Sequence, residues 1–340
     1  MCRRIFYISG PKRNLQSGYW LFDSLKKDGY EIIPYFNRKD DQEKITSYIR
    51  FKRLFFNSLS VVFKARFGDM ILVYDHDYSG YVLSFLISWF KPYLTVLKIN
   101  QMGGNKKHLL PFHLKVLAKR GFRNMYTTCN NSTIGLLFSR ELNIPISHFI
   151  PIPDSISDFG KDILSIKNKT ERNYIFMGGA THRDYALFVE CAKRLPQYEF
   201  IAVTFSKYKH CFEAAPKNVK VIYGLSEMDF YEMIAHSNIV FVPLTNDLQG
   251  GQMVIFQAAL LGKPIITTQN EAIGTYFDED SITLMQIGDV DAAVRYLQMF
   301  MCDAKLRIMQ GRNAHDVIRK FTTEEIYKQY KQLLFVKANK

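Results

Sequence analysis

The chain has 340 residues, 47% of them hydrophobic, which excludes a disordered protein and leaves room for two ordinary domains. The net charge is +13, and residues 1–160 hold nearly all of it, with 23 Lys and Arg against 12 Asp and Glu, which suits nucleic acid, an anionic membrane surface or an anionic substrate. Five cysteines without paired spacing argue against a structural zinc site and favour a reduced, cytoplasmic chain.

Short apolar runs alternate with helix-length segments through the first half of the chain. The opening run is only as long as a strand, so we expect no signal peptide. The apolar stretch 81–97 is interrupted by Lys91-Pro92 and falls short of the roughly 20 residues that a membrane span needs. The predicted strands are residues 4–9, 31–35, 69–74, 94–100 and 124–128, with a helix near 18–27. This βαβ pattern predicts a parallel sheet.

A second alternating series follows a polar stretch. Its predicted strands are residues 173–177, 200–204, 219–223, 239–242 and 264–268. We therefore expect two doubly wound, Rossmann-like α/β domains that face each other across a cleft. The expected boundaries are an N-terminal domain at 1–156, a linker at 157–172, a C-terminal domain at 173–321, and a helix at 322–340 that can cross back to the N-terminal domain.

Three glycine-containing loops have the chemistry to hold a diphosphate. One follows a predicted strand at Gly178-Gly179 and carries Arg183 just before the next helix, and the second is Gly250-Gly251 before a helix start. Ser17-Gly18 opens the first helix of the chain. One such loop is weak support, because glycine turns are common and Arg183 can simply be solvated. Two of them at strand ends in one domain favour an anion site.

Two runs in the second half resemble a known family signature. The segments SEMDFYEMIAHSNIVFVPL (226–244) and QGGQMVIFQAALLGKPIITT (249–268) resemble the C-terminal signature of GT-B glycosyltransferases, in particular the family 4 (glycosyl transferases group 1) type. That signature has a strand ending in Pro, an E-G-F-G loop, and E-A-x-x-x-G-K-P. The segments LFDSLKKDGYEI (21–32) and IPIPDSI (150–156) are similar to the first helix with the second strand and to the interdomain entry.

The resemblance implies a GT-B fold, with the acceptor on the N-terminal side and a nucleotide-sugar donor in the C-terminal domain. The donor is a substrate, and neither a cofactor nor a metal is required. Carried over position by position, the residues that contact the donor are the diphosphate ligands Gly250, Gly251, Gln252 and Arg183 with Gly178 and Gly179, the nucleobase segment Gly224-Leu225, and the glutamines Gln249 and Gln257.

The two glutamines stand where the family has paired glutamates. Glutamine keeps one acceptor oxygen but loses the charge. Gln257 can still bind the ribose diol with weaker hydrogen bonds, unless it only satisfies a loop carbonyl. Gln249 cannot stabilise a cationic sugar as a carboxylate does, so a retaining mechanism that needs this carboxylate is disfavoured. An inverting route would need a base from the N-terminal half.

The candidate bases are Asp77, Asp75 and, third, His76, in the sequence LVYDHDYSG. They follow a predicted strand, where polar groups meet a ligand. The same cluster can also be a turn and helix cap. Since neighbouring side chains on a strand-like backbone point in different directions, we expect no metal site here.

Residues 46–67 predict an amphipathic helix with a basic side. Its apolar side is predicted to hold Tyr48, Ile49, Phe55, Phe56, Leu59, Val62 and Phe63, and its polar side Arg50, Arg53, Asn57 and Lys64. Lys106-Lys107, Arg120 and Arg123 can extend the basic surface. Such a helix can lie on the inner face of a bacterial cell membrane or simply pack on its own sheet.

The sequence thus predicts a hexosyltransferase, with stereochemistry left open. It would move a sugar from a nucleotide-diphosphate donor to a glycan or lipid-linked acceptor in bacterial surface polysaccharide synthesis. The alternatives are a catalytically silent GT-B protein that binds a glycan or a partner, and a sugar-nucleotide epimerase. Charge alone suggests nucleic-acid binding, and no recognition motif accompanies it, so we expect no nucleic-acid partner.

Overall fold

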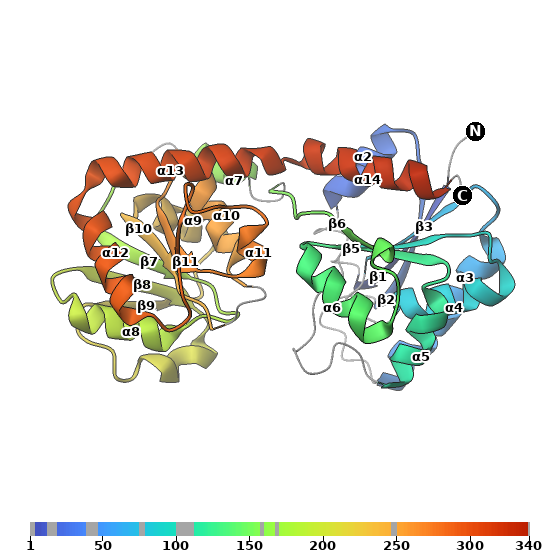
Figure 1. Cartoon of the computed structure of the whole chain (residues 1–340), viewed down its shortest axis with the longest axis horizontal. Coiled ribbons are helices and arrows are strands. Elements are labelled where there is room, and N and C mark those ends of the chain that lie inside the picture. The colour runs from blue at the N-terminus through green and yellow to red at the C-terminus, as the bar shows by residue number, and fades with distance from the viewer. Residues whose placement is uncertain are drawn as a thin grey trace. The chain divides into compact units, whose positions relative to one another are not determined.

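The computed structural model contains two compact units (Figure 1). It describes residues 4–11, 19–38, 47–74, 79–99, 112–156, 160–166, 170–245 and 250–338. Unit 1 comprises Met1–Ser155 with Thr323–Lys340, and unit 2 comprises Ile156–Thr322. The C-terminal helix therefore belongs to the same unit as the first strand of the chain.

Unit 1 is built on a parallel six-stranded sheet. The strand order is β2-β1-β3-β4-β5-β6. The strands are β1 (Arg4–Pro11), β2 (Glu31–Arg38), β3 (Met70–Tyr74), β4 (Val96–Ile99), β5 (Met125–Cys129) and β6 (Phe149–Pro151). The central strands β3 and β4 are buried almost throughout, including Lys98 of β4, because both faces of a parallel sheet are covered.

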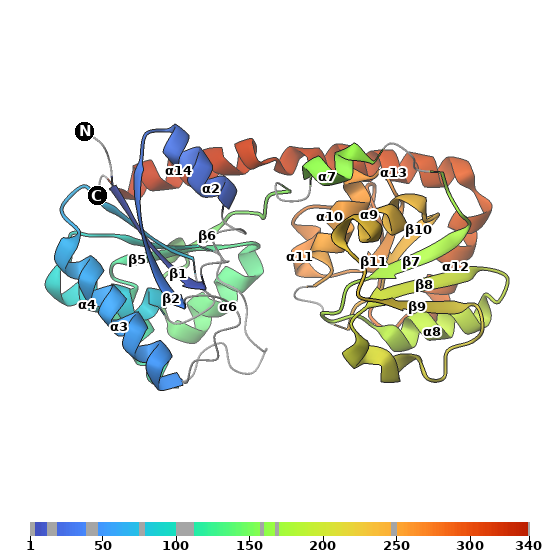
Figure 2. The same ribbon diagram turned by 180° about the vertical axis from the view of Figure 1, so that it is seen from behind.

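Helices cover the two faces of this sheet. The helices are α2 (Tyr19–Lys27), α3 (Ser47–Lys64), α4 (Ser79–Phe90), α5 (Phe112–Gly121), α6 (Ser132–Leu142) and α14 (Thr323–Ala338). Helices α3 to α6 pack in sequence on one side, and α2 with α14 lie on the other (Figures 1 and 2). Tyr330 of α14 packs on the rest of unit 1. Its ring contacts Trp20, and its hydroxyl forms a buried hydrogen bond with Thr128.

Unit 2 repeats the architecture with another parallel six-stranded sheet. Its order is β12-β11-β10-β7-β8-β9. The strands are β7 (Tyr174–Gly178), β8 (Glu199–Thr204), β9 (Val219–Tyr223), β10 (Ile239–Val242), β11 (Ile265–Thr268) and β12 (Thr283–Met285). Apolar clusters fill both faces of this sheet. The predicted pair of doubly wound, Rossmann-like domains is confirmed.

The helices of unit 2 are mostly those expected between the strands. They are α7 (Gly160–Ser165), α8 (Tyr185–Arg194), α9 (Glu227–His236), α10 (Gln252–Leu260), α11 (Glu271–Gly274), α12 (Val290–Cys302) and α13 (Ala304–Ile318). The segment predicted as a linker contains α7, whose Ile163 is fully buried in the core beside α10. The burial of Ile163 thus anchors this short helix to the core of unit 2.

The Gly-Lys-Pro stretch after α10 is a structural element. Gly262 adopts φ +69°, a left-handed conformation that ends the helix. Lys263 is buried, and its Nζ lies 3.9 Å from Glu171, whose carboxylate also forms a 2.7 Å ion pair with Arg307 of α13. This part of the resembled signature therefore joins α10 to α13.

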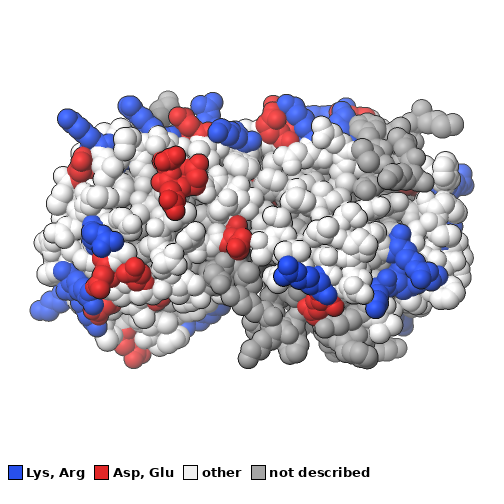
Figure 3. Space-filling model, in the orientation of Figure 1, with Lys and Arg blue, Asp and Glu red and all other residues white. Residues whose placement is uncertain are grey.

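The surface carries side chains of both charges, and the length and apolar character of the helices bear on membrane insertion. On the face shown in Figure 3, basic and acidic side chains are interspersed. Among the residues that the structure describes, no helix combines the length and apolar character that crossing a membrane demands.

Candidate functional site

The two glycine loops of unit 2 leave neighbouring strands at the point where the strand order reverses. The chain runs from β7 to β8 on one side and later returns to the other side of β7 as β10. In doubly wound sheets, ligands bind at this switch point, outside the carboxyl ends of the strands. Gly178 ends β7 and Gly179 begins the loop after it, and the loop after β10 carries Gly250-Gly251.

Backbone hydrogen bonds join these two loops. The amide of Asp184 donates to the carbonyl of Pro243 (2.9 Å), and the amide of Thr245 donates to the carbonyl of His182 (3.0 Å). A Cβ placed on Gly250 would lie 3.4 Å from the His182 side chain. The sequence predicted two separate loops that could bind an anion at strand ends. In the structure the two loops are hydrogen-bonded to each other and together form a rim along the strand ends.

Arg183 is a buried cation at the centre of this rim. Only 8% of the residue is exposed, and its guanidinium donates from Nε to the carbonyl of Gly178 (2.7 Å) and from Nη1 to the carbonyl of Thr181 (2.9 Å). No carboxylate of the described residues forms an ion pair with it. Burial lowers the pKa of Arg183 to about 10, so the group stays charged at neutral pH. Among the described residues it therefore has no counter-ion, a role that a bound anion can fill.

Glycine is required at Gly179, beside this cation. The residue has φ +91°, and a Cβ added there would overlap Nη2 of Arg183. The missing side chain lets the guanidinium lie against the loop backbone. The loop geometry and the position of the cation therefore depend on one another.

The second loop presents a helix start. Gly250 (φ +135°) and Gly251 (φ +78°) precede α10, and the first intrahelical bond runs from the amide of Ile255 to the carbonyl of Gly251. The preceding amides of the first turn have no partner within the helix, and the helix dipole adds positive potential there. The buried Nε2 of Gln252 also lacks a hydrogen-bond partner among the described residues. This end of α10 is rich in donors.

Gln257 lies on α10 with only 8% of its surface exposed. Its Oε1 is buried without a hydrogen-bond partner among the described residues, while its side chain contacts the hydroxyl of Tyr231 on α9. That hydroxyl in turn donates to the carboxylate of Glu227. Because Oε1 has no partner, the amide NH₂ is the group that meets Tyr231, and one acceptor oxygen remains for a ligand.

The predicted nucleobase segment lies further along the same edge. Gly224 and Leu225 follow β9, and Gly224 is exposed with φ +72° and has no atom within 4 Å of the point where a Cβ would lie. Helix α9 starts after them. The ring of Phe230 on this helix packs on Gly178, so α9 contacts the switch point. Helix α9 thus links this segment to the first glycine loop.

Several candidates from the sequence lie outside the described residues. Gln249, the loop Asp75-His76-Asp77, the loop Ser17-Gly18 and Lys106-Lys107 are among them. β3 ends at Tyr74, directly before the predicted bases. Sequence reasoning also missed Glu227, Tyr231 and His182. Glu227 and Tyr231 lie within the signature segment 226–244, whereas His182, at φ +57°, gave no signal in the sequence.

Comparisons with known proteins identify the architecture. No protein-family model matches the chain, and a comparison with curated protein sequences finds no match. A glycosyltransferase from Rickettsia africae is similar in structure with a TM-score of 0.75 at 10% identity, over 98% of this chain and 97% of that one. HepE from Anabaena in complex with UDP has a TM-score of 0.70 at 12% identity, over 98% and 100%.

The lipopolysaccharide outer core galactosyltransferase WaaB is also similar, with a TM-score of 0.70 at 14% identity over 98% of this chain and 99% of that one. Identities this low show the fold and not the reaction. The likeness extends over both units and both sheets of the chain. The chain has the GT-B fold of these glycosyltransferases.

Proposed function

We propose that the protein is a glycosyltransferase that moves a hexosyl group from a nucleotide-diphosphate donor to a glycan or lipid-linked acceptor in bacterial surface polysaccharide synthesis. The proposal places it on the cytoplasmic side of the membrane. The observation that carries it is the buried guanidinium of Arg183, which has no carboxylate partner among the described residues and lies at the switch point between two glycine loops. A diphosphate supplies the charge that this cation lacks.

In this proposal the donor lies along the carboxyl edge of the second sheet. Arg183 and the amides of Gly250, Gly251 and Gln252 bind the diphosphate, and Oε1 of Gln257 accepts from a ribose hydroxyl. Gly224-Leu225 contact the base. The solved structures of HepE with UDP and with UDP-glucose support a nucleotide sugar as the ligand. The guanidinium and the helix start supply the positive charge, so we propose no metal or cofactor.

The chemical step remains a prediction from the sequence. Asp77, with Asp75 and His76 as alternatives, is proposed as the base that deprotonates the acceptor hydroxyl, because the amide of Gln249 cannot take a proton. Gln249 is proposed to contact the donor as a neutral ligand. An inverting displacement follows from this assignment, and the anomeric configuration of the product tests it.

A thermal-shift screen with UDP-, GDP-, TDP- and CMP-sugars tests the donor site. A ligand that binds only the folded protein raises its melting temperature, and we expect one nucleotide class to do so. Gln257→Ala should reduce that shift, and an unchanged shift would contradict the ribose contact. Protein that is stabilised by none of the four classes would overturn the proposed donor.

Turnover separates the remaining candidates. Transfer to an acceptor or slow hydrolysis of the donor is expected from a transferase. Donor binding without turnover would favour a silent GT-B binding protein, to which the two uncharged glutamines point. Conversion of the donor sugar in the absence of any acceptor would favour an epimerase.

Gly179→Ala is expected to weaken nucleotide-diphosphate binding because the new Cβ displaces the guanidinium of Arg183. Gly288→Ala is the matched control, since it has a similar φ of +74° with open space around it. Both alanines occupy the left-handed region and should cost about 1 kcal/mol of stability. Calorimetric titration should then show reduced UDP affinity for Gly179→Ala alone. Equal affinities in the two variants would mean that the loop does not position Arg183 for the ligand.

A further inference from the structure

A cluster of exposed aromatic side chains lies on unit 1, at the ends of α3 and α4. Phe63 is 74% exposed, Phe67 83%, Trp89 62%, Phe90 66% and Tyr93 51%. We call these five residues the aromatic surface. Single exposed apolar residues are ordinary, whereas an apolar group of this size on one face marks an interaction site.

Contacts between the end of α3 and the end of α4 bring part of the aromatic surface together. The rings of Phe67 and Tyr93 lie 6.2 Å apart, and Lys91, between Phe90 and Tyr93, donates to the carbonyls of Phe63 and Ala65. These bonds join the end of α4 to the end of α3. The side chain of Lys91 therefore links the segment that carries Phe90 and Tyr93 to the segment that carries Phe63 and Phe67.

The predicted orientation of α3 is wrong, and its error exposes this surface. Val62 was expected on the same side as Phe56 and Phe63, but it is buried with Leu54 and Val61 against the sheet. Phe56 and Phe63 point outward, at 56% and 74% exposure. The helix is apolar on two sides, and only one of them is needed by the core.

Exposed basic side chains lie on α3, on α5 and directly after these helices. Lys52, Lys64, Arg66, Lys119 and Arg123 are exposed. The guanidinium of Arg120 lies 4.5 Å from the ring centroid of Trp89. Within the described segments 47–74, 79–99 and 112–124, Asp69 is the one acidic residue, and Arg4 already pairs with it at 2.7 Å. An aromatic surface with this charge complements an anionic one.

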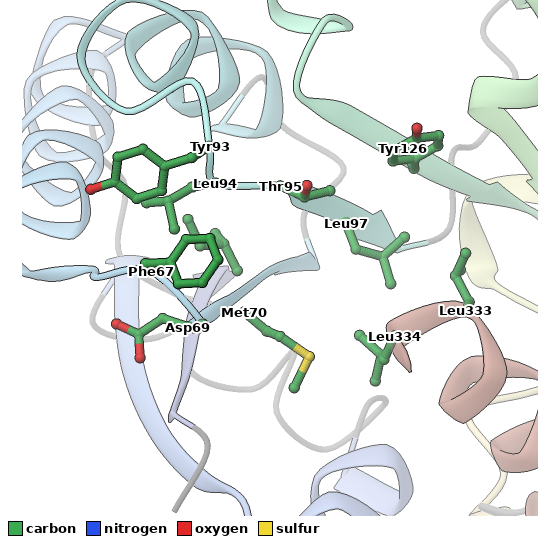
Figure 4. Close-up of a pocket in the computed structure, with 12 residues that line it drawn as sticks. Phe67, Asp69, Met70, Tyr93, Leu94, Thr95, Leu97, Tyr126, Leu333 and Leu334 are labelled. Carbon is green, nitrogen blue, oxygen red and sulfur yellow. The ribbon is translucent and has the colours of Figure 1, made fainter. Parts of the chain in front are cut away.

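A hollow opens beside the same surface. Phe67 and Tyr93 stand at one end of it and Leu333 and Leu334 of α14 at the other (Figure 4). It lies where β3, β4 and β5 begin, at the edge of the sheet opposite to the carboxyl edge that such sheets use for ligands. Docking here leaves the carboxyl edge uncovered.

We propose that the aromatic surface docks unit 1 on the headgroup region of an anionic phospholipid bilayer. Aromatic rings favour the boundary between headgroups and acyl chains, and nearby Lys and Arg are attracted to anionic lipid. The hollow is lined mostly by apolar residues and borders the aromatic surface at Phe67 and Tyr93. This inference deepens the membrane-side location of the proposed function, but it uses no residue of the donor site.

Vesicle flotation without donor or acceptor tests the docking. The protein should float with vesicles that contain phosphatidylglycerol about tenfold more than with phosphatidylcholine alone, and high salt should remove the difference. The double variant Phe67→Ser, Trp89→Ser should lose this binding and remain folded, because both side chains are exposed. Ile308→Ser with Met309→Ser, at 53% and 55% exposure on α13, is the matched control and should bind normally.

Tryptophan fluorescence reports which surface is in contact. The chain has two tryptophans, and Trp20 packs on Tyr330. In Trp20→Phe, emission from Trp89 should shift to the blue with anionic vesicles. Absent flotation, binding that the double variant retains, or an unshifted Trp89 would each overturn the proposal. If Phe67→Ser instead abolished self-association in solution, the surface would belong to a second copy. None of these failures touches the proposed transferase, which the donor screen tests separately.

Discussion

Replacing Arg183 by glutamine should weaken the binding of UDP about 10- to 100-fold and leave the affinity for uridine unchanged. The buried guanidinium donates to two loop carbonyls and keeps free N–H groups for a phosphate. Hydrogen bonds to charged groups contribute about 1.5–3 kcal/mol, which corresponds to the expected loss. Calorimetric titration with the diphosphate and the nucleoside measures the two affinities.

Two controls separate a phosphate contact from a role in the scaffold. Arg194→Gln removes a half-exposed arginine that already pairs with Glu190 and Asp291, and it should change neither affinity. Arg183→Lys keeps the charge but loses the planar fork, so we expect an intermediate loss. Equal losses for UDP and uridine in Arg183→Gln would show that the side chain only supports the loop.

The same residue predicts a dependence on pH. Burial lowers the pKa of Arg183 to about 10, so the folded protein holds less of the charged form than the unfolded chain between pH 10 and the higher, ordinary pKa of arginine. This group therefore lowers stability below pH 10, and that cost is relieved as the pH rises through this range. A bound diphosphate favours the charged form. UDP affinity should thus fall as the pH approaches 10, beyond any change seen in Arg183→Gln.

The sheets could be predicted from the sequence because their strands are buried apolar runs between polar turns. β6 and β12 escaped prediction, since each has three residues and carries no periodic signal. α7 escaped because the helix is short, and Ile163 is the core residue that its described side chains show. Short elements are fixed by their neighbours in space, and a local pattern does not record those neighbours.

In the candidate site, too, local features could be predicted from the sequence and contacts between distant residues could not. Glycine pairs and helix starts are local features, so both loops after β7 and β10 were visible in the sequence. Their hydrogen bonds to each other, the burial of Arg183 and the contact between Tyr231 and Gln257 depend on strand order and helix packing. The structure also explains why position 257 is a glutamine. Its NH₂ can donate to the hydroxyl of Tyr231, which already donates to Glu227, whereas a carboxylate at this position could not donate.

Gly311→Ala should lower the stability of unit 2 by about 3 kcal/mol, the upper end of the range for overpacked cores. Gly311 lies on α13 where the helix meets the end of α10, and an added Cβ would overlap the backbone carbonyl of Gly262. Side chains can move away from a new methyl group, but here the obstacle is backbone. Lys263 and Arg307 hold the two segments together through Glu171, so α13 cannot retreat without weakening buried ion pairs.

Gly274→Ala is the matched control, because this exposed helical glycine has no atom within 4 Å of a Cβ and should gain up to about 0.5–1 kcal/mol. A cost of 3 kcal/mol corresponds to a fall of roughly 6–12 °C in melting temperature for a domain of this size. Scanning calorimetry of the two variants measures the difference. A Gly311→Ala protein that melts with the wild type would mean that the backbone at Gly262 moves aside without cost and that this contact does not limit stability.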